Sequence, residues 1–253
     1  MSCLVLLCKK PFSVLTPSLA LSGFTVGGVH QFGLAKRRGQ VAGTGCRLCP
    51  LEPGVHPSPR ERLSNRLPVF WTPGVTFKIT LYEGKHFTGR KLEVFGDCDN
   101  FQDRGFMNRV NSVRVESGAW VCFDHPDFRG QQFILEHGDY PDFYRWNGHN
   151  DHMGSCRPVR MHGEHFRLEI FEGCNFTGQC LEFKEDCPFL QSRGWSKNCV
   201  NAIKAYGDGA WVLYEEPNYR GRMYLVERGD FRSFSDWEAP SARVQSLRRV
   251  ANF

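Results

Sequence analysis

Hydrophobic and polar residues alternate in short runs along residues 78–253. Ile79 and Leu81 alternate with polar neighbours, and Leu92 and Val94 do the same on the far side of a turn that contains glycine. A period of two is typical of strands that bury one face. The pattern therefore predicts short antiparallel strands joined by tight turns.

A turn signature repeated four times joins these strands. Each copy has an aromatic residue, four other residues, a second aromatic residue, one further residue and a glycine. The copies are Tyr82, Phe87 and Gly89; Phe123, Phe128 and Gly130; Phe171, Phe176 and Gly178; and Tyr214, Tyr219 and Gly221. Glycine suits a backbone that takes positive φ or passes beneath a ring, so each copy is predicted to be a hairpin covered by an aromatic side chain. We interpret the unit as a Greek key.

The spacing of the copies shows how the units are grouped. Gly89 and Gly178 are 89 residues apart, and Gly130 and Gly221 are 91 residues apart. Two pairs of tryptophans, Trp120 with Trp211 and Trp146 with Trp237, repeat the spacing of 91. The copies therefore alternate in type, and the longer repeat contains two of them.

The predicted fold is all-β, with two domains that are each an antiparallel β-sandwich of two Greek-key motifs. Residues 78–161 form the first domain with motifs 1 and 2, and residues 162–253 form the second with motifs 3 and 4. The polar segment 160–165 joins them. Each domain is expected to contain eight short strands whose inner faces share one core.

Residues 1–77 lack this pattern. They hold eight of the 14 Pro and nine of the 26 Gly, with nine basic and two acidic side chains. We predict an unordered, basic extension; the alternative is a signal peptide, with Lys9 and Lys10 before an apolar stretch. The remaining 23 basic and 25 acidic residues are interspersed, which gives no footprint for nucleic acid. No stretch is long enough to span a membrane.

Other short motifs do not form a convincing catalytic or cofactor site. His162, Glu164 and His165 fall in the joining segment, without a helix to place them on one face. Cys46 and Cys49 make half of a zinc knuckle. Arg228–Asp230 resembles an adhesion tripeptide, and Asn175 begins a glycosylation sequon, but both overlap the repeat's own turns. Eleven Cys imply disulfides in a secreted chain and reduced thiols in the cytosol.

Residues 78–253 resemble the βγ-crystallin family, the two-domain, four-Greek-key proteins of the vertebrate eye lens. The shared signatures are the four turns, Trp120 and Trp146, and the runs at 138–143, 155–157 and 246–250. The short linker is most similar to that of a γ-crystallin, and the run at 96–101 favours one particular γ subtype.

The resemblance implies roles for several positions. A serine from the fourth strand of a motif covers each hairpin, and Ser112, Ser155 and Ser246 stand at these positions, whereas the third motif has Ala202. Arg157 and Arg248 would flank an apolar interface between the domains. The six residues expected there are Val121, Ile134, Val159, Val212, Leu225 and Val250.

The same resemblance raises calcium as a ligand and photoprotection as a property. The nearest calcium loop has Asn150, Asp151 and Ser155 but Gly154 in place of Ser or Thr, so we expect a degenerate site with too few oxygens.

In the resembling lens proteins, paired tryptophans dissipate ultraviolet light. Trp120 with Trp146, and Trp211 with Trp237, are the corresponding pairs.

The function implied is that of a non-catalytic structural constituent of the eye lens. The protein would be cytoplasmic in lens fibre cells and monomeric, with no cofactor, metal, nucleic acid, membrane or small-molecule substrate. Weak association with other crystallins stays open. The alternatives are a calcium-binding or stress-related module outside the lens, which would need a complete calcium loop, and a secreted adhesive or glycoprotein, which would need a working signal peptide.

Overall fold

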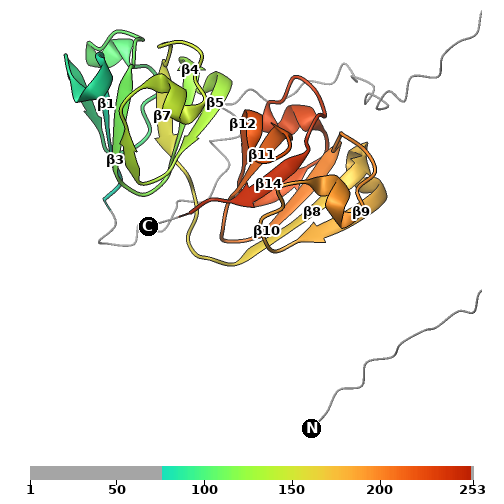
Figure 1. The fold of residues 1–253 in the computed structure, drawn as a ribbon. Helices are drawn as coiled ribbons and strands as arrows, with labels where there is room; N and C mark the ends of the chain where they lie inside the picture. Colours follow the sequence, from blue (N-terminus) through green and yellow to red (C-terminus); the bar gives the residue numbers. More distant parts are fainter. Residues whose placement is uncertain (1–75, 252–253) are drawn as a thin grey trace, which may run out of the picture. The chain divides into compact units, whose positions relative to one another are not determined.

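The computed structural model describes residues 76–251, and all of them lie in one compact unit. The sequence expectations for residues 1–75, including the extension and the cysteines at 46 and 49, lie outside this range. The described chain is built from short strands and single-turn 3₁₀ helices (Figure 1). No helix within residues 76–251 has the length and apolar character needed to cross a membrane.

The first domain contains seven strands, each only three to seven residues long. Three 3₁₀ helices, η1 (Lys85–Phe87), η2 (Gln102–Arg104) and η3 (Phe143–Trp146), lie between them. The strands are β1 (Lys78–Tyr82), β2 (Lys91–Val94), β3 (Ser112–Ser117), β4 (Trp120–His125), β5 (Arg129–Leu135), β6 (Gly138–Tyr140) and β7 (Ser155–Pro158).

The second domain repeats this order. Its 3₁₀ helices are η4 (Cys174–Phe176), η5 (Leu190–Arg193) and η6 (Phe234–Trp237). Its strands are β8 (Phe166–Gly173), β9 (Thr177–Phe183), β10 (Ala202–Gly207), β11 (Trp211–Glu216), β12 (Arg220–Val226), β13 (Gly229–Phe231) and β14 (Ser246–Arg249).

The strands form three antiparallel sheets. One four-stranded sheet has the order β2-β1-β3-β6, and its counterpart has the order β13-β10-β8-β9. The third sheet has six strands in the order β14-β11-β12-β5-β4-β7, and the pairing of Gln132 with Met223 joins its two halves. Each domain is therefore a two-layered sandwich, and one layer continues from one domain into the other.

The expectation of eight strands in each domain was wrong. The eighth segment is reduced to a single bridge, Cys98 with Cys156 in the first domain and Cys187 with Leu247 in the second. In the first domain the chain leaves the sheet directly after Cys98, because the Phe101 N–H donates to the Gly154 carbonyl at 3.0 Å and helix η2 follows.

The motifs also exchange strands, since β6 of motif 2 pairs with β3 of motif 1.

Each sandwich encloses one hydrophobic core. Ile79, Leu81 and Val94 of the alternating pattern are at most 4 % exposed and line the first core. Their equivalents in the second core include Leu168, Ile170 and Phe183. Burial of this apolar surface is the main stabilising contribution to each domain, at about 25 cal/mol per Å².

Candidate functional site

The four aromatic hairpins share one geometry. The two rings of each copy pack edge to face, with centroids 5.7, 5.9, 5.4 and 5.7 Å apart in chain order. The glycines Gly89, Gly130, Gly178 and Gly221 have φ between 78° and 89°. The second aromatic residue of each copy also has positive φ, which the sequence did not indicate. A bulky side chain adopts that conformation rarely, so the ring packing must hold it there.

A serine hydroxyl closes three of the hairpins. Ser112 Oγ accepts from the Phe87 N–H at 2.9 Å and donates to the Gly84 carbonyl at 2.5 Å. Ser155 Oγ accepts from the Phe128 N–H and donates to the His125 carbonyl in the same way. Ser246 Oγ accepts from the Tyr219 N–H and donates to the Glu216 carbonyl. These hydroxyls are fully buried, and their bonds link the three hairpins to strands β3, β7 and β14.

The third hairpin differs because its covering position has no hydroxyl. Ala202 is fully buried and lies opposite Phe171 in the β10–β8 register. The neighbouring Asn201 side chain still donates to the Glu172 carbonyl at 2.6 Å. The hairpin of motif 3 therefore retains an amide contact but not the serine bridge.

The apolar side chains assigned to the interface lie in one buried cluster. Val121, Ile134, Val159, Val212, Leu225 and Val250 are all at most 7 % exposed. Six further buried residues complete the cluster, namely Ala119, Phe123, Met161, Ala210, Tyr214 and Met223. Both domains contribute equally, so the interface buries an apolar core of its own.

Two matching ion pairs flank this cluster. Arg157 donates to both carboxylate oxygens of Glu227, at 2.8 and 3.3 Å. Arg248 donates to Glu136 at 2.5 Å, and 91 residues separate both the two arginines and the two glutamates. Sequence reasoning found the arginines but missed the glutamates, although the spacing of 91 could have identified them.

Each glutamate also holds a stretch of backbone. Glu227 accepts from the Arg160 N–H of the linker at 2.8 Å, and Glu136 accepts from the Ala251 N–H at 2.9 Å. Burial disfavours the charged form of Glu227, but the charge and hydrogen bonds of Arg157 outweigh it and lower its pKa. The pKa of Arg248 is raised by Tyr214 and Glu136 against the effect of burial.

The pseudo-twofold symmetry fails where β5 meets β12. Gln132 accepts from the Leu225 N–H at 2.8 Å and donates to the Trp237 carbonyl at 3.2 Å. The equivalent position, 91 residues later, is Met223, whose sulfur lies 3.2 Å from the Ile134 nitrogen. The amide and the thioether thus join the two halves of the six-stranded sheet in different ways.

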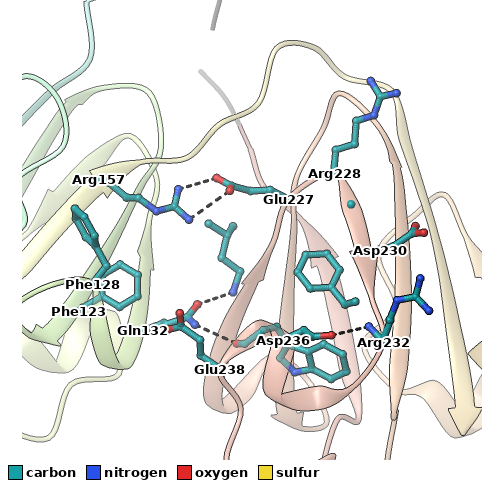
Figure 2. Close-up of a pocket in the computed structure, with 14 residues that line it drawn as sticks. Phe123, Phe128, Gln132, Arg157, Glu227, Arg228, Asp230, Arg232, Asp236 and Glu238 are labelled. Carbon is teal, nitrogen blue, oxygen red and sulfur yellow. Dashed lines mark hydrogen bonds and ion pairs between the residues drawn. The ribbon is translucent and has the colours of Figure 1, made fainter. Parts of the chain in front are cut away.

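A cavity of about 390 Å³ opens beside Gln132 (Figure 2). Aromatic and apolar side chains line it together with Arg157, Arg228 and Arg232 and four carboxylates. Arg157 and Glu227 are bonded to each other, and the Asp236 carboxylate accepts from the Arg232 and Ser233 N–H groups. Because its charges are balanced and several are already paired, the cavity has no marked preference for one sign of ligand.

The degenerate calcium loop uses its oxygens internally. The Asn150 side chain accepts from the His152 N–H at 3.0 Å, and Asp151 binds Arg109 at 2.9 Å. Burial opposes ionisation of Asp151, but Arg109 outweighs it and lowers its pKa. Ser155 Oγ is committed to its hairpin. A cation at this loop would have to break these bonds to obtain ligands.

The other short motifs are dispersed in the structure. His165 is paired with Asp208 at 3.1 Å and has an 87 % exposed side chain. Asn175 and Arg228 lie on exposed turns. No group of three or more His, Cys, Asp or Glu side chains able to hold a metal ion occurs within residues 76–251.

Not all of the described cysteines are reduced. Cys98, Cys122, Cys156, Cys180 and Cys187 are free thiols. Cys174 and Cys199 are disulfide-bonded, which corrects the expectation that a cytosolic chain would have only reduced thiols. Both lie in motif 3, whose hairpin lacks the serine bridge.

The tryptophans are buried in the two cores. Trp120 and Trp146 belong to the first core, and Trp211 and Trp237 to the second. Each indole packs edge-on against another aromatic ring, with centroids 5.8–6.5 Å apart. The second core also contains Trp195. The repeat of tryptophans between the domains did not reveal it, because the equivalent residue 89 positions earlier is Phe106.

Comparisons with known proteins show what this chain is similar to. The chain is 93 % identical to gamma-crystallin N of Rattus norvegicus over 176 residues, which cover 70 % of this chain and 96 % of the rat protein. It is 81 % identical to gamma-crystallin N of Xenopus tropicalis over the same length, with the same coverage. A solved beta gamma crystallin from Ciona intestinalis is 36 % identical, with a TM-score of 0.32, and covers 32 % of this chain and 99 % of its own.

The rat and Xenopus matches, both to gamma-crystallin N, also confirm the subtype favoured by the run at 96–101, which is typical of the γ-N member. The family model for Beta/Gamma crystallin matches residues 78–159 and 167–250, one match for each sandwich. The chain therefore belongs to the beta/gamma crystallin family.

Proposed function

We propose that this chain is a structural constituent of the eye lens. It is a soluble, long-lived and non-catalytic protein that contributes to transparency and refractive index. The names of its relatives support a lens crystallin role, since they are gamma-crystallins. The two family domains cover almost all of the described residues.

The observation that carries the proposal is the duplicated interface. Two closed cores are joined by a third apolar cluster, which is flanked by matching Arg–Glu pairs. Paired domains of this kind slow unfolding, because neither domain can open without exposing the interface of the other. A protein that must persist at high concentration benefits from a slow rate of unfolding.

The composition supports the optical part of the proposal. Aromatic residues make up 13 % of the chain, and arginines outnumber lysines by 23 to nine. Aromatic rings, guanidinium groups and sulfur atoms are polarisable. Residues 78–253 have 23 basic and 25 acidic side chains, so charges of both signs are interspersed and the net charge is small. Such a surface favours solubility without a large repulsive field.

The proposal places the chain in the cytoplasm of lens fibre cells as a monomer that needs no cofactor. Association with other crystallins would be weak. A calcium-binding role outside the lens is less well supported, because the oxygens of the nearest loop are committed to internal bonds.

Three measurements test the proposal together. Quantitative mass spectrometry of dissected lens fibre cells should detect the chain, and other ocular tissues should contain far less. Differential refractometry should give a refractive index increment above that of a globular protein of average composition. Calorimetric titration with calcium should show no saturable heat. Absence from fibre cells, an ordinary increment or saturable calcium binding would each argue against the lens role.

A further inference from the structure

Three cysteine side chains meet in the core of the first domain. Cys98, Cys122 and Cys156 are 3 %, 0 % and 0 % exposed and belong to one buried cluster. All three are free thiols. The proposed function uses none of them, so their proximity requires a separate explanation.

The strand register brings two of them closest together. Cys156 of β7 lies opposite Cys122 of β4, and it forms the isolated bridge with Cys98 on its other side. The Cys156 N–H and carbonyl both bond to Cys98, each at 2.9 Å. Cys122 and Cys156 are therefore a non-hydrogen-bonded pair, in which Cα atoms are about 4.5 Å apart. A disulfide spans Cα separations of about 4.4–6.8 Å, so it fits here without a shift of either strand.

The side chains agree with this register. Cys122 and Cys156 lie directly opposite each other on antiparallel strands, so their side chains project from the same face into one buried cluster. Burial, together with Cys122, raises the pKa of Cys156 well above its usual value. Since the thiolate is the reactive form, the closed domain protects the pair from oxidation.

The second domain shows that the fold does not require these thiols. Leu213 and Leu247 occupy the positions equivalent to Cys122 and Cys156 and are paired in the same register. Both leucines are fully buried, and Cys187 bridges to Leu247 as Cys98 bridges to Cys156. The thiol pair is thus particular to the first domain.

We propose that Cys122 and Cys156 form a modification site at which a low-molecular-weight disulfide closes a cross-strand disulfide within the first domain. Strand β7 has four residues and lies at the end of the six-stranded sheet, so its outward movement can expose Cys156. On its outer side the backbone of the strand pairs at the single bridge to Cys98, and the Phe101 N–H bonds to the Gly154 carbonyl just before the strand begins.

The reaction proceeds by two exchange steps. The Cys156 thiolate attacks one sulfur of the small disulfide, forms a mixed disulfide and releases the other half as a thiolate. The Cys122 thiolate then attacks the Cys156 sulfur and displaces the second half. Two protein thiols lose two protons and two electrons, and the small disulfide is reduced to two thiols.

The test uses the full chain in glutathione buffers with a rising oxidised fraction. Free thiols are alkylated in denaturant, and the protein is digested with trypsin without reduction. Cys98, Cys122 and Cys156 fall in separate peptides, residues 92–104, 115–129 and 146–160, since Pro158 blocks cleavage after Arg157. The expected product is the linked pair 115–129 and 146–160, lighter by two hydrogen atoms than its separate peptides. The exposed Cys180 should carry glutathione instead.

Two variants sharpen the result. Cys122→Ala should abolish the linked pair, whereas Cys98→Ala should retain at least about half of the wild-type yield. A dominant link between 92–104 and 146–160, or only glutathione on Cys156 at full oxidation, would overturn the proposal. The wild-type peptide map decides the question even if a variant fails to fold.

Discussion

Arg157 of the first domain and Glu227 of the second form a two-pronged ion pair, with bonds of 2.8 and 3.3 Å. The arginine and glutamate side chains are only 19 % and 11 % exposed. Arg248 and Glu136 repeat the contact with the roles of the domains reversed. The two pairs fix the domains to each other and hold the linker and the C-terminal segment through backbone bonds.

Replacing Glu227 should uncouple the domains. In Glu227→Gln the Arg157 guanidinium would lose its charged partner, and breaking such a mostly buried pair costs about 3 kcal/mol. Guanidinium denaturation should show a lower midpoint and a clearer separation of the two domain transitions. Glu93→Gln is the matched control, because its pair with Lys91 is exposed and screened by solvent, so its loss should lower the midpoint far less. An equal effect of both substitutions would contradict a special role for Glu227.

Acid should weaken the same contact. The folded-state pKa of Glu227 is lowered, so the unfolded chain binds its proton more readily. The resulting stabilisation is fully present above the unfolded value of about 4.3 and is lost as pH falls through the lower folded value. Denaturation midpoints measured from neutral pH into this acidic window should fall more steeply for the wild type than for Glu227→Gln. Parallel curves would show that other carboxylates dominate.

Restoring the missing serine should strengthen the second domain. In Ala202→Ser the new hydroxyl would lie where Ser112 accepts from the Phe87 N–H and donates to the Gly84 carbonyl. The equivalent groups in motif 3 are the Phe176 N–H and the Gly173 carbonyl. We expect a gain of about 1 kcal/mol in the free energy of unfolding. Ser112→Ala should lose a similar amount in the first domain, and a destabilised Ala202→Ser variant would show that the site cannot accept a hydroxyl.

The buried indoles should be dimmer in the folded protein than in the unfolded chain. Trp120 and Trp146 share one core, and Trp195, Trp211 and Trp237 share the other, so excitation can pass between rings and be lost to nearby backbone amides. In a Trp71→Phe background, emission should rise and shift to the red in guanidinium. Trp146→Phe should change the emission of Trp120 and lower stability through lost packing. Unchanged brightness on unfolding would argue against photoprotection.

Local chemistry and repetition allowed the sequence by itself to determine the fold class. Each hairpin depends on an aromatic pair and a glycine within eight residues, and each strand on a period of two, so both can be recognised without knowledge of distant partners. The spacings of 89 and 91 residues then indicated two domains, and the resemblance to the βγ-crystallins implied the six apolar residues that the structure places in one cluster. The unordered extension expected for the N-terminal segment stays a prediction, because residues 1–75 lie outside the described structure.

Only the tertiary structure decided which distant segments meet. Motif 2 supplies β6 to the sheet of motif 1, and the expected eighth strand shrinks to one bridge at Cys98. Glu136 and Glu227 gain their roles from arginines 112 and 70 residues away, and Gln132 from Trp237, 105 residues away. The thiol contact of Cys122 and Cys156 likewise depends on strand register. Such contacts are set by the packing of whole strands, which no local pattern of residues encodes.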